Sequence, residues 1–437
     1  MTDLPRRHQR AKGPTAVRHG RLPRRRAVGT VMRILAAAVA VVAVSVGSVA
    51  AYAVWDVARS VKTGVVLATL PGHTKQAIPN VGAIQGGVNL LLTGTDSRSN
   101  LGGIYDSADE QDASTGEGNN DVTMLLHIAQ DHKSAMVISF PRDLMVEIPD
   151  CPAPTGGGTV DGSSSAMFNT ALSRGGLPCV VLTVEKLTGI DIPFAAVINF
   201  NGVSAMSNAI GGVTVCLATP VTDDFTTPPL DLPAGENTLV GDVALSFLRS
   251  RHGVGDGSDL GRISNQQVFL SALARKVVSG GVLGNPVQLY GLAKAAVENI
   301  TPSDTLTNPT TLVEIALALK DTGLDNMVFM QYPAVTDPDD SNRVIVDDTA
   351  AQAINTALVN DQPVKLTGTT GRAAEDQAGT GTPTPAVPAA PDATAPATTA
   401  PAPGDTSTAP ATTGPIELPS SITGQTAAQQ TCTKGNN

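Results

Sequence analysis

Residues 122–140 have the sequence VTMLLHIAQDHKSAMVISF, in which two largely apolar runs flank the polar turn AQDHKS. The continuous apolar character of 122–128 and 135–140 predicts strands that are buried on both faces of a central sheet. Further strands are predicted at 88–92, 194–200, 213–217 and 326–330. Helices are predicted at 165–174, 178–188, 202–210, 239–251, 261–279, 286–299 and 309–320. This alternation predicts an α/β fold, an αβα sandwich around a central mixed sheet.

The first 55 residues predict a membrane anchor. Residues 1–33 contain ten Lys and Arg residues and one acid, whereas residues 34–55, ILAAAVAVVAVSVGSVAAYAVW, carry no charge. Twenty-two such residues are long enough to cross a bilayer core of about 30 Å, and basic flanks stay in the cytoplasm. We therefore expect a cytoplasmic leader (1–33), one transmembrane helix (34–55) and an extracellular remainder. A cleaved signal peptide is the alternative, although its apolar region usually has about 7–15 residues.

The net charge excludes one class of function. The chain carries −10 and residues 1–33 carry 10 − 1 = +9, so the exported part carries −19. Proteins that bind nucleic acid without sequence preference need a basic face. Nucleic acid is therefore not an expected partner.

Composition divides the exported part into three segments. Residues 56–84 have no clear periodicity and predict a stalk, and residues 85–362 predict one globular domain. We expect residues 363–437 to form a disordered tail, because Ala, Thr, Pro, Gly and Ser dominate residues 367–428 within it. The Ala/Gly/Val/Thr-rich composition of the chain indicates a high-GC source.

The four cysteines predict disulfides, because all of them follow the apolar span and none has metal-site spacing. Cys151 and Cys179 flank one Gly/Ser-rich loop and form the favoured pair. Cys432 can reach back from the tail to Cys216, and three connectivities remain open.

Polar residues cluster where the predicted strands end. Asp96 and Arg98 follow the first strand in GTDSR, Arg142 follows 135–140 in SFPRD, and Asp121 precedes 122–128. If the strand at 122–128 runs antiparallel to the first, these groups meet at one edge of the sheet. Two carboxylates beside arginines are suited to a hard cation next to a phosphate. Simpler interpretations are a turn at Asp96 and a local ion pair between Arg142 and Asp143.

A second cluster lies in RSRHGVGDGSDLGRISNQ, residues 249–266. Arg249 and Arg251 close one predicted helix, and Arg262 and Gln266 share a face of the next. Converging guanidinium groups suit a pyrophosphate. The alternative is a set of solvated arginines around a loop, with Asp259 as a helix N-cap. The glycine pattern is not that of a nucleotide-binding loop.

Several stretches, in order, resemble the LytR-CpsA-Psr family of membrane-anchored phosphotransferases. They are NLLLTGTDSR, DVTMLLHI, AMVISFPRDLMVEIPD, FNTALSRGG, LTGIDIPFAAVINFNGV, AIGGVTVCL, LVGDVALSFLRSRH and GSDLGRISNQQ, within about 88–275. The resemblance implies transfer of a phosphate-linked glycopolymer, such as a teichoic acid, from a polyprenyl-pyrophosphate carrier to peptidoglycan, with Mg²⁺. It also implies a lipid groove between the sheet and the helices.

The resemblance assigns roles to residues. It implies that Asp96 and Asp121 hold the metal, and that catalysis involves these two with Arg98 and Arg142. The residues implied to bind the pyrophosphate are Arg142, Arg249, Arg251, Arg262 and Gln266. One departure is Asn119-Asn120-Asp121, where many members have Arg-Ser-Asp, so one positive charge is missing here.

Two other functions stay open on the sequence. One is hydrolysis of the same polyprenyl pyrophosphate, and the other is a non-catalytic, membrane-anchored wall-binding or regulatory protein. The polymer also stays open among teichoic acid, capsule and arabinogalactan.

Overall fold

The computed structural model describes residues 27–72, 87–97, 117–154, 156–278, 281–282, 284–377 and 414–436. The chain divides into two units, Met1–Asp56 and Val57–Asn437, which are described separately. Helix α1 (Ala27–Ser60) contains the predicted span. Among the described residues it is the only helix long and apolar enough to cross a membrane. Residues 1–26 of the predicted leader lie outside the described residues.

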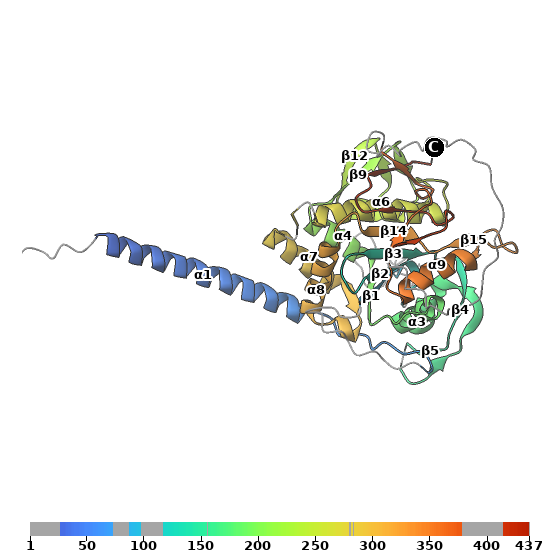
Figure 1. Ribbon diagram of the computed structural model, residues 1–437, viewed down its shortest axis with the longest axis horizontal. Coiled ribbons are helices and arrows are strands. Elements are labelled where there is room, and N and C mark those ends of the chain that lie inside the picture. The colour runs from blue at the N-terminus through green and yellow to red at the C-terminus, as the bar shows by residue number, and fades with distance from the viewer. Residues whose placement is uncertain are drawn as a thin grey trace, which may run out of the picture. The chain divides into compact units, whose positions relative to one another are not determined.

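The folded unit is built on a mixed, seven-stranded sheet (Figure 1). Strand β1 runs parallel to β8 and β3 runs parallel to β14, whereas β2 is antiparallel to both of its neighbours. The carboxyl ends of β1, β3 and β8 therefore lie at the same edge as the start of β2. The strand order is β13 (Ile300–Pro302), β8 (Phe194–Ile198), β1 (Val88–Thr95), β2 (Asn120–Ile128), β3 (Ala135–Phe140), β14 (Met327–Gln331) and β20 (Gly424–Thr426).

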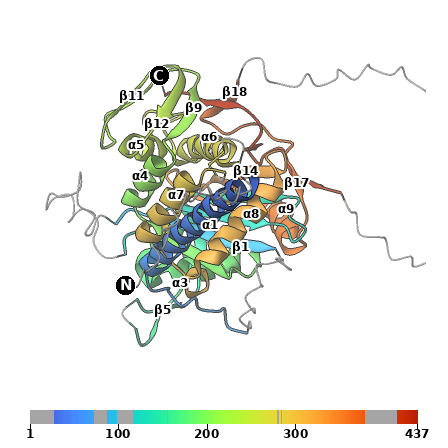
Figure 2. The same ribbon diagram turned by 90° about the vertical axis from the view of Figure 1, so that its left-hand side faces the viewer.

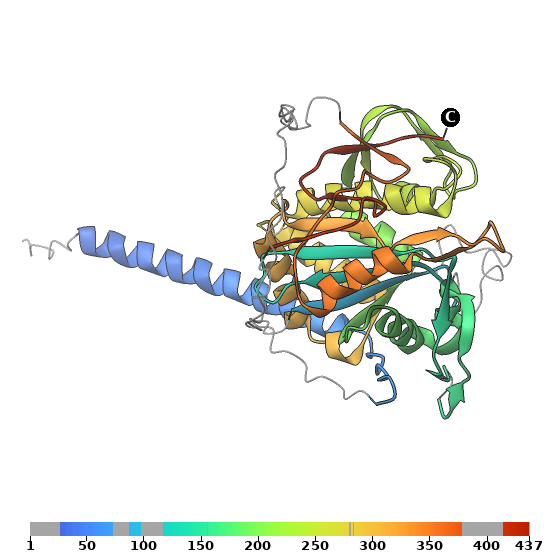
Figure 3. The same ribbon diagram turned by 45° about the vertical axis from the view of Figure 1, so that its right-hand side comes forward.

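Helices cover both faces of this sheet, with α6 on one side and α3 and α9 on the other (Figures 1 and 3). Alternate strand residues enter two cores: Leu91 and Leu125 pack with α3 and α9, whereas Leu90 and Leu126 pack with α6 and α8. The predicted αβα sandwich is confirmed. The α-helices that the structure describes in the folded unit are α3 (Ala171–Thr188), α4 (Phe200–Ala209), α5 (Asp242–Arg249), α6 (Asp259–Val278), α7 (Pro286–Asn299), α8 (Pro309–Thr322) and α9 (Asp348–Val359).

Smaller sheets flank the central one. Figure 2 shows β9 and β12 beside α5 and α6, where they close a third core around Phe247 and Phe269. One four-stranded sheet has the order β12 (Gly235–Leu239), β9 (Val213–Leu217), β21 (Thr431–Thr433) and β18 (Ala374–Asp376). Another has β15 (Ala334–Thr336), β16 (Val344–Val346), β4 (Leu144–Ile148) and β7 (Ser163–Met167). Three pairs are β10 (Val221–Asp223) with β11 (Leu230–Leu232), β5 (Cys151–Pro152) with β6 (Thr159–Val160), and β17 (Val364–Lys365) with β19 (Ile416–Glu417).

The predicted boundaries of the domain are wrong at both ends. At its start, the stalk does not begin at 56, because α1 continues to Ser60 and Val65 then exchanges backbone hydrogen bonds with Pro302 and Asp304. Leu67 is buried in the core beside α3. Residues 57–72 therefore belong to the folded unit, and residues 73–84 of the predicted stalk lie outside the described residues.

At the other end, residues 363–377 and 414–436 are ordered parts of the fold, contrary to the predicted tail. Strand β20 extends the central sheet beside β14, and β21 inserts beside β9. Buried side chains fix this segment, since Gln425 donates to Ser271 of α6 and Thr433 donates to Asn265. Residues 378–413 of the predicted tail lie outside the described residues.

One predicted helix is also wrong in part. Residues 163–167 form β7, which pairs with β4, so the helix expected at 165–174 begins only at Ala171. Pairing with a neighbouring strand outweighs the local helical pattern here.

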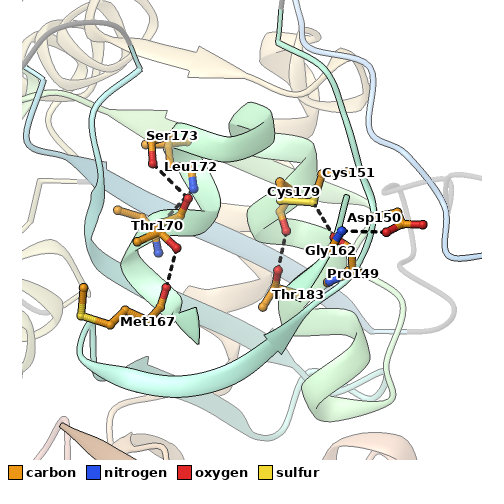
Figure 4. Close-up of a disulfide and its surroundings, with 11 residues drawn as sticks. Pro149, Asp150, Cys151, Gly162, Met167, Thr170, Leu172, Ser173, Cys179 and Thr183 are labelled. Atoms are coloured by element: carbon orange, nitrogen blue, oxygen red, sulfur yellow. Dashed lines mark hydrogen bonds between the residues drawn. A yellow bond between two sulfur atoms is a disulfide. The ribbon is translucent and has the colours of Figure 1, made fainter. Parts of the chain in front are cut away.

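Two disulfides are formed, Cys151–Cys179, which is the favoured pair, and Cys216–Cys432. Figure 4 shows the first, which joins β5 to α3. Helix α3 is interrupted at Gly175 and Gly176. A Cβ atom at Gly175 would lie 2.7 Å from Cys151 Cβ and 2.9 Å from Cys179 Cβ, so only glycine fits against this bond.

Candidate functional site

A cavity of about 520 Å³ lies between the ends of β1 and β2 and helices α4 to α7. One part of its wall is charged and most of the rest is apolar. The charged and amide side chains are those of Asp121, Asn199, Asp223, Arg142, Arg249, Arg251, Arg262 and Gln266.

The first charged contact of this wall joins two strands. Arg142 follows β3, and its Nη1 donates to the Asp121 Oδ1 atom, 2.7 Å away, at the start of β2. The antiparallel pairing of β1 and β2 brings Thr95 opposite Asn120, so the residue after β1, Asp96, also lies at this edge. The predicted convergence of these polar groups is confirmed for Asp96, Asp121 and Arg142.

The buried carboxylate of Asp259 is the centre of the arginine cluster. Its Oδ1 atom lies 2.9 Å from Arg251 Nη2, 2.7 Å from Arg262 Nη2 and 3.6 Å from Arg142 Nε. Arg262 Nη2 also donates to the backbone oxygen of Asp121, at 2.7 Å. Asp259 thus draws arginines from three chain segments to one point. It is not the N-cap of α6, since Ser258 Oγ accepts from the Gly261 backbone there.

Burial and crowding change the proton affinities within this cluster. For Arg142, burial lowers the pKa, but the charge and hydrogen bond of Asp121 outweigh burial, so the pKa is raised. Burial and the nearby positive charge of Arg262 lower the pKa of Arg251. Burial, followed by the charge of Asp259, raises the pKa of Asp143. An anion placed among these guanidinium groups would relieve the repulsion between Arg251 and Arg262.

The guanidinium groups keep unused donors in the buried wall. The Nε atoms of Arg142 and Arg262 are buried and have no hydrogen-bond partner. The Oδ2 atom of Asp259, an acceptor, is also buried and has none. Buried donors of this kind are usually satisfied by protein, water or ligand. The cluster therefore has the chemistry of an anion site.

The two remaining predicted ligands lie on the helices that frame the cluster. Arg249, the last residue of α5, has its guanidinium carbon 4.3 Å from the centroid of the Phe200 ring. Gln266 donates to the backbone oxygen of Leu248 and lines the cavity one turn after Arg262, as predicted.

The loop between α5 and α6 turns the chain so that these helices converge. Asp223 is buried and its Oδ2 atom accepts from Ser250 Oγ at 2.6 Å and from the Gly253 backbone at 3.2 Å. Gly255 and Gly257 have φ values of +57° and +76°, a conformation that favours glycine. The Gly-rich loop is thus a structural turn that presents Arg251.

The apolar wall extends away from the arginines along α6. From Arg262 to Val277 the helix rises about 22 Å, at about 1.5 Å per residue. Leu92 and Met124 of the sheet face this helix across the cavity. The other apolar lining residues include Ile198, Phe200, Val203, Met206, Ile210, Leu245, Leu248, Phe269, Leu270, Leu273, Val277 and Leu292. The cavity can therefore hold a ligand with an anionic head and a long apolar tail.

Asp96 does not line the cavity but lies directly beside it. Its Oδ1 atom accepts from the Asn119 backbone at 2.7 Å, and its backbone nitrogen donates to the Asn119 oxygen. No group of three or more His, Cys, Asp or Glu side chains suited to a metal occurs in the part of the chain that the structure describes. Magnesium commonly binds one or two carboxylates, with phosphate and water completing its shell. Asp96 and Asp121, which β1 and β2 bring to the same edge of the sheet, supply carboxylate oxygens of the kind that magnesium prefers. Arg98 lies outside the described residues.

Comparison with known proteins places this site in a family. The family model described as the LytR_cpsA_psr family matches residues 62–360. The chain belongs to the LytR-CpsA-Psr family. Its match covers the whole cavity wall and stops before the C-terminal strands β20 and β21.

Curated relatives of this family member come from several bacteria. It is 28% identical over 284 residues to the cell wall biosynthesis protein LcpA of Corynebacterium glutamicum, covering 60% of this chain and 52% of LcpA. It is 30% identical to the probable cell wall biosynthesis protein LcpB of the same organism, and the match covers 62% of this chain and 61% of LcpB. It is 26% identical to TagT of Bacillus subtilis, a polyisoprenyl-teichoic acid–peptidoglycan teichoic acid transferase, and the match covers 56% of this chain and 70% of TagT. The chain thus spans little more than half the length of LcpA.

A solved structure shares the fold. Protein gbs0355 of Streptococcus agalactiae is 22% identical and superposes with a TM-score of 0.50, covering 63% of this chain and 87% of that one. This similarity concerns the fold alone.

The Asn119 side chain takes no part in the contact between Asn119 and Asp96. Both hydrogen bonds between Asn119 and Asp96 use the Asn119 backbone, so they do not depend on its side chain.

Sequence reasoning missed two features of the site. The central position of Asp259 was not predicted, although its place between Arg251 and Arg262 in the sequence is a signal for it. The residues of the apolar wall were not named, because their 3.6-residue spacing on α6 is the same as that of an ordinary core helix.

Proposed function

We propose that this protein transfers a phosphate-linked cell-wall glycopolymer from a polyprenyl-pyrophosphate carrier to peptidoglycan. One observation carries the proposal: a single cavity joins a partly buried arginine cluster to a long apolar wall. A polyprenyl pyrophosphate has the same two parts, a multiply charged head and a long hydrocarbon tail. The names of the relatives LcpA, LcpB and TagT support the same process.

The head group binds at the arginines in this proposal. Arg142, Arg251 and Arg262 are already held by Asp259, so little side-chain entropy is lost when the phosphates bind. Their planar donors suit phosphate oxygens in pairs. Arg249 and Gln266 complete the rim, and the tail lies against α6 and the sheet.

Asp96 and Asp121 are the side chains that would hold Mg²⁺, and a bound Mg²⁺ supplies positive charge that draws electron density from the bridging phosphate bond. Asp121 also orients Arg142 through their 2.7 Å hydrogen bond. The carboxylate thus serves both the cation and the anion sites.

The transfer step needs positioning and charge neutralisation rather than a covalent enzyme intermediate. A peptidoglycan hydroxyl oxygen bonds to the polymer-bearing phosphorus, and its proton is released. The bond from that phosphorus to the bridging oxygen breaks, and polyprenyl phosphate leaves. The arginine cluster stabilises the charge that grows on the phosphate oxygens.

The location follows from α1. We propose that α1 crosses the cytoplasmic membrane once, with the basic N-terminal leader in the cytoplasm and the folded unit outside. The tail of the carrier and the catalytic unit then share one membrane surface, and peptidoglycan is within reach.

An in vitro transfer assay tests this function. Full-length protein in detergent receives a synthetic polyprenyl-pyrophosphate-linked saccharide, peptidoglycan oligomers and Mg²⁺. We expect a phosphodiester-linked saccharide on peptidoglycan. Release of saccharide phosphate into water, with or without acceptor, would identify a hydrolase instead, and turnover of neither kind would identify a non-catalytic protein.

A further inference from the structure

Phe225 differs from every other phenylalanine of the folded unit. Its side chain is 79% exposed, whereas the other seven phenylalanines are buried at 9% or less. It also lines the cavity described above. A residue that is both exposed and part of the cavity wall lies at the mouth, where solvent meets the site.

The ring does not stand alone at the mouth. Its centroid lies 4.4 Å from that of His252, which is exposed and follows Arg251 directly in the chain. Because Arg251 bonds to Asp259 in the arginine cluster, the two rings lie beside the charged part of the cavity. The deep apolar wall, which reaches Val277 and Leu292, lies further along α6 and α7.

The exposed position of Phe225 is fixed by the backbone around it. Phe225 lies in the loop between β10 and β11, and its backbone nitrogen donates to Asp223 Oδ1 at 3.0 Å. The other carboxylate oxygen of Asp223 accepts from Ser250 and Gly253. Ser246 of α5 donates to the Pro228 oxygen at 2.7 Å, which fixes the far side of the loop. The loop that carries Phe225 is therefore tied to the segment that carries Arg251.

An aromatic face held in water beside a phosphate site suits a sugar ring. A pyranose presents C–H groups on one face, which pack against an aromatic ring, while its hydroxyls remain free for hydrogen bonds. The exposed His252 imidazole supplies a donor and an acceptor next to that face. A membrane lipid would instead be met by the deep apolar wall at the other end of the cavity.

We propose that Phe225 and His252 form a saccharide-stacking subsite at the mouth of the cavity, which holds a pyranose ring next to the phosphate-binding arginines. This subsite deepens the proposed function and rests on it for the identity of the sugar. The ring can come from the acceptor peptidoglycan or from the first sugar of the donor. Both sources have the same stacking chemistry, and the test separates them.

Binding measurements on full-length protein in detergent test the subsite without relying on turnover. The first probe is a soluble peptidoglycan oligomer, and the second is a prenyl pyrophosphate with and without one attached sugar. The variants are Phe225→Ala, Phe225→Leu and Phe225→Tyr. The control is Val287→Ala, since Val287 is equally exposed at 78% but does not line the cavity.

We expect Phe225→Ala and Phe225→Leu to weaken binding of the sugar-bearing probe about 3- to 10-fold, which is the value of one stacking contact. Phe225→Tyr keeps the ring face and binds like the wild type, and Val287→Ala leaves the binding of every probe unchanged.

A loss confined to the oligomer assigns the subsite to the acceptor, and a loss confined to the sugar-bearing donor assigns it to the donor. A Kd for the sugar-free lipid that weakens equally would overturn the proposal, as would normal saccharide binding by Phe225→Leu or no saccharide binding by the wild type. A protein that binds saccharide through Phe225 but transfers none would contradict the proposed function and leave the subsite intact.

Discussion

Arg142 and Asp121 lie 2.7 Å apart, Nη1 to Oδ1, across the edge of the sheet where β3 ends and β2 begins. The same guanidinium has its Nε atom 3.6 Å from Asp259 at the start of α6. One side chain therefore links the carboxylate proposed for the metal to the centre of the arginine cluster. The two proposed sites are not independent.

This link predicts the effect of Arg142→Ala. The substitution removes a phosphate donor and leaves Asp121 without its ion-pair partner. Hydrogen bonds to charged groups contribute about 1.5–3 kcal/mol, which corresponds to a loss of about 10- to 150-fold in affinity for a prenyl pyrophosphate. Isothermal titration measures this Kd, and Lys186→Ala is the control, because Lys186 pairs with Glu147 away from the cavity. Equal affinity of Arg142→Ala and wild type would remove Arg142 from the phosphate site.

Asp96→Asn tests the proposed magnesium site. The change removes one charge with almost no change in size, and the amide oxygen still accepts from the Asn119 backbone. We expect transfer to fall by orders of magnitude and to recover in part at high Mg²⁺ concentration, because a weakened site refills by mass action. A chelator should have the same effect on the wild type. Normal transfer by the variant, together with no effect of the chelator, would make Asp96 a turn residue.

Prediction from sequence succeeded for features that depend on residues close together in the chain. Apolar runs identified β3 and β9 to the residue, and the antiparallel β2 brought Asp121 and Arg142 together as expected. It failed where tertiary neighbours decide the outcome. β20 and β21 have three residues each and contain Gly, Gln and Thr, and they become strands only because β14, β9 and a disulfide receive them.

The residues of the site also divide into those with a local sequence signal and those that only the fold identifies. The arginines were identified because guanidinium groups are rare in the exported chain and have specific chemistry. Leu273 and Val277 were not, because no local pattern distinguishes a residue that lines a cavity from one in a filled core.

Stability should depend on the disulfide between Cys151 and Cys179. Replacing both by Ser opens a link between residues 28 apart in sequence and should cost about 2–4 kcal/mol in the free energy of unfolding. Denaturant unfolding of the non-reduced proteins measures the difference. Free thiols at both positions in the exported wild type would contradict the pairing, as would an unchanged unfolding midpoint in the variant.

Glu185 predicts a pH dependence of stability. Burial raises its pKa from 4.5 to about 7, although its Oε1 atom accepts from the Ile192 backbone. The folded state therefore holds this proton more tightly than the unfolded state does. The contribution is fully present below about pH 4.5 and is lost as the pH rises through 7.

Glu185→Gln isolates this contribution, because the amide oxygen can still accept from Ile192. We expect the melting temperature of the variant to fall less than that of the wild type between pH 5 and 8. Parallel curves for the two proteins would show that Glu185 is not the titrating group.

The central claim, that one cavity binds a charged head and an apolar tail, is tested most directly by the chain-length dependence of affinity. Full-length protein is titrated with inorganic pyrophosphate and with prenyl pyrophosphates of increasing length. Affinity should rise with each isoprene unit until the apolar wall is filled, since each buried CH₂ contributes about 0.8 kcal/mol. Leu273→Asn, in the middle of that wall, should flatten the rise while leaving the affinity for pyrophosphate unchanged. An affinity that does not depend on chain length, or a rise that Leu273→Asn does not alter, would contradict the account.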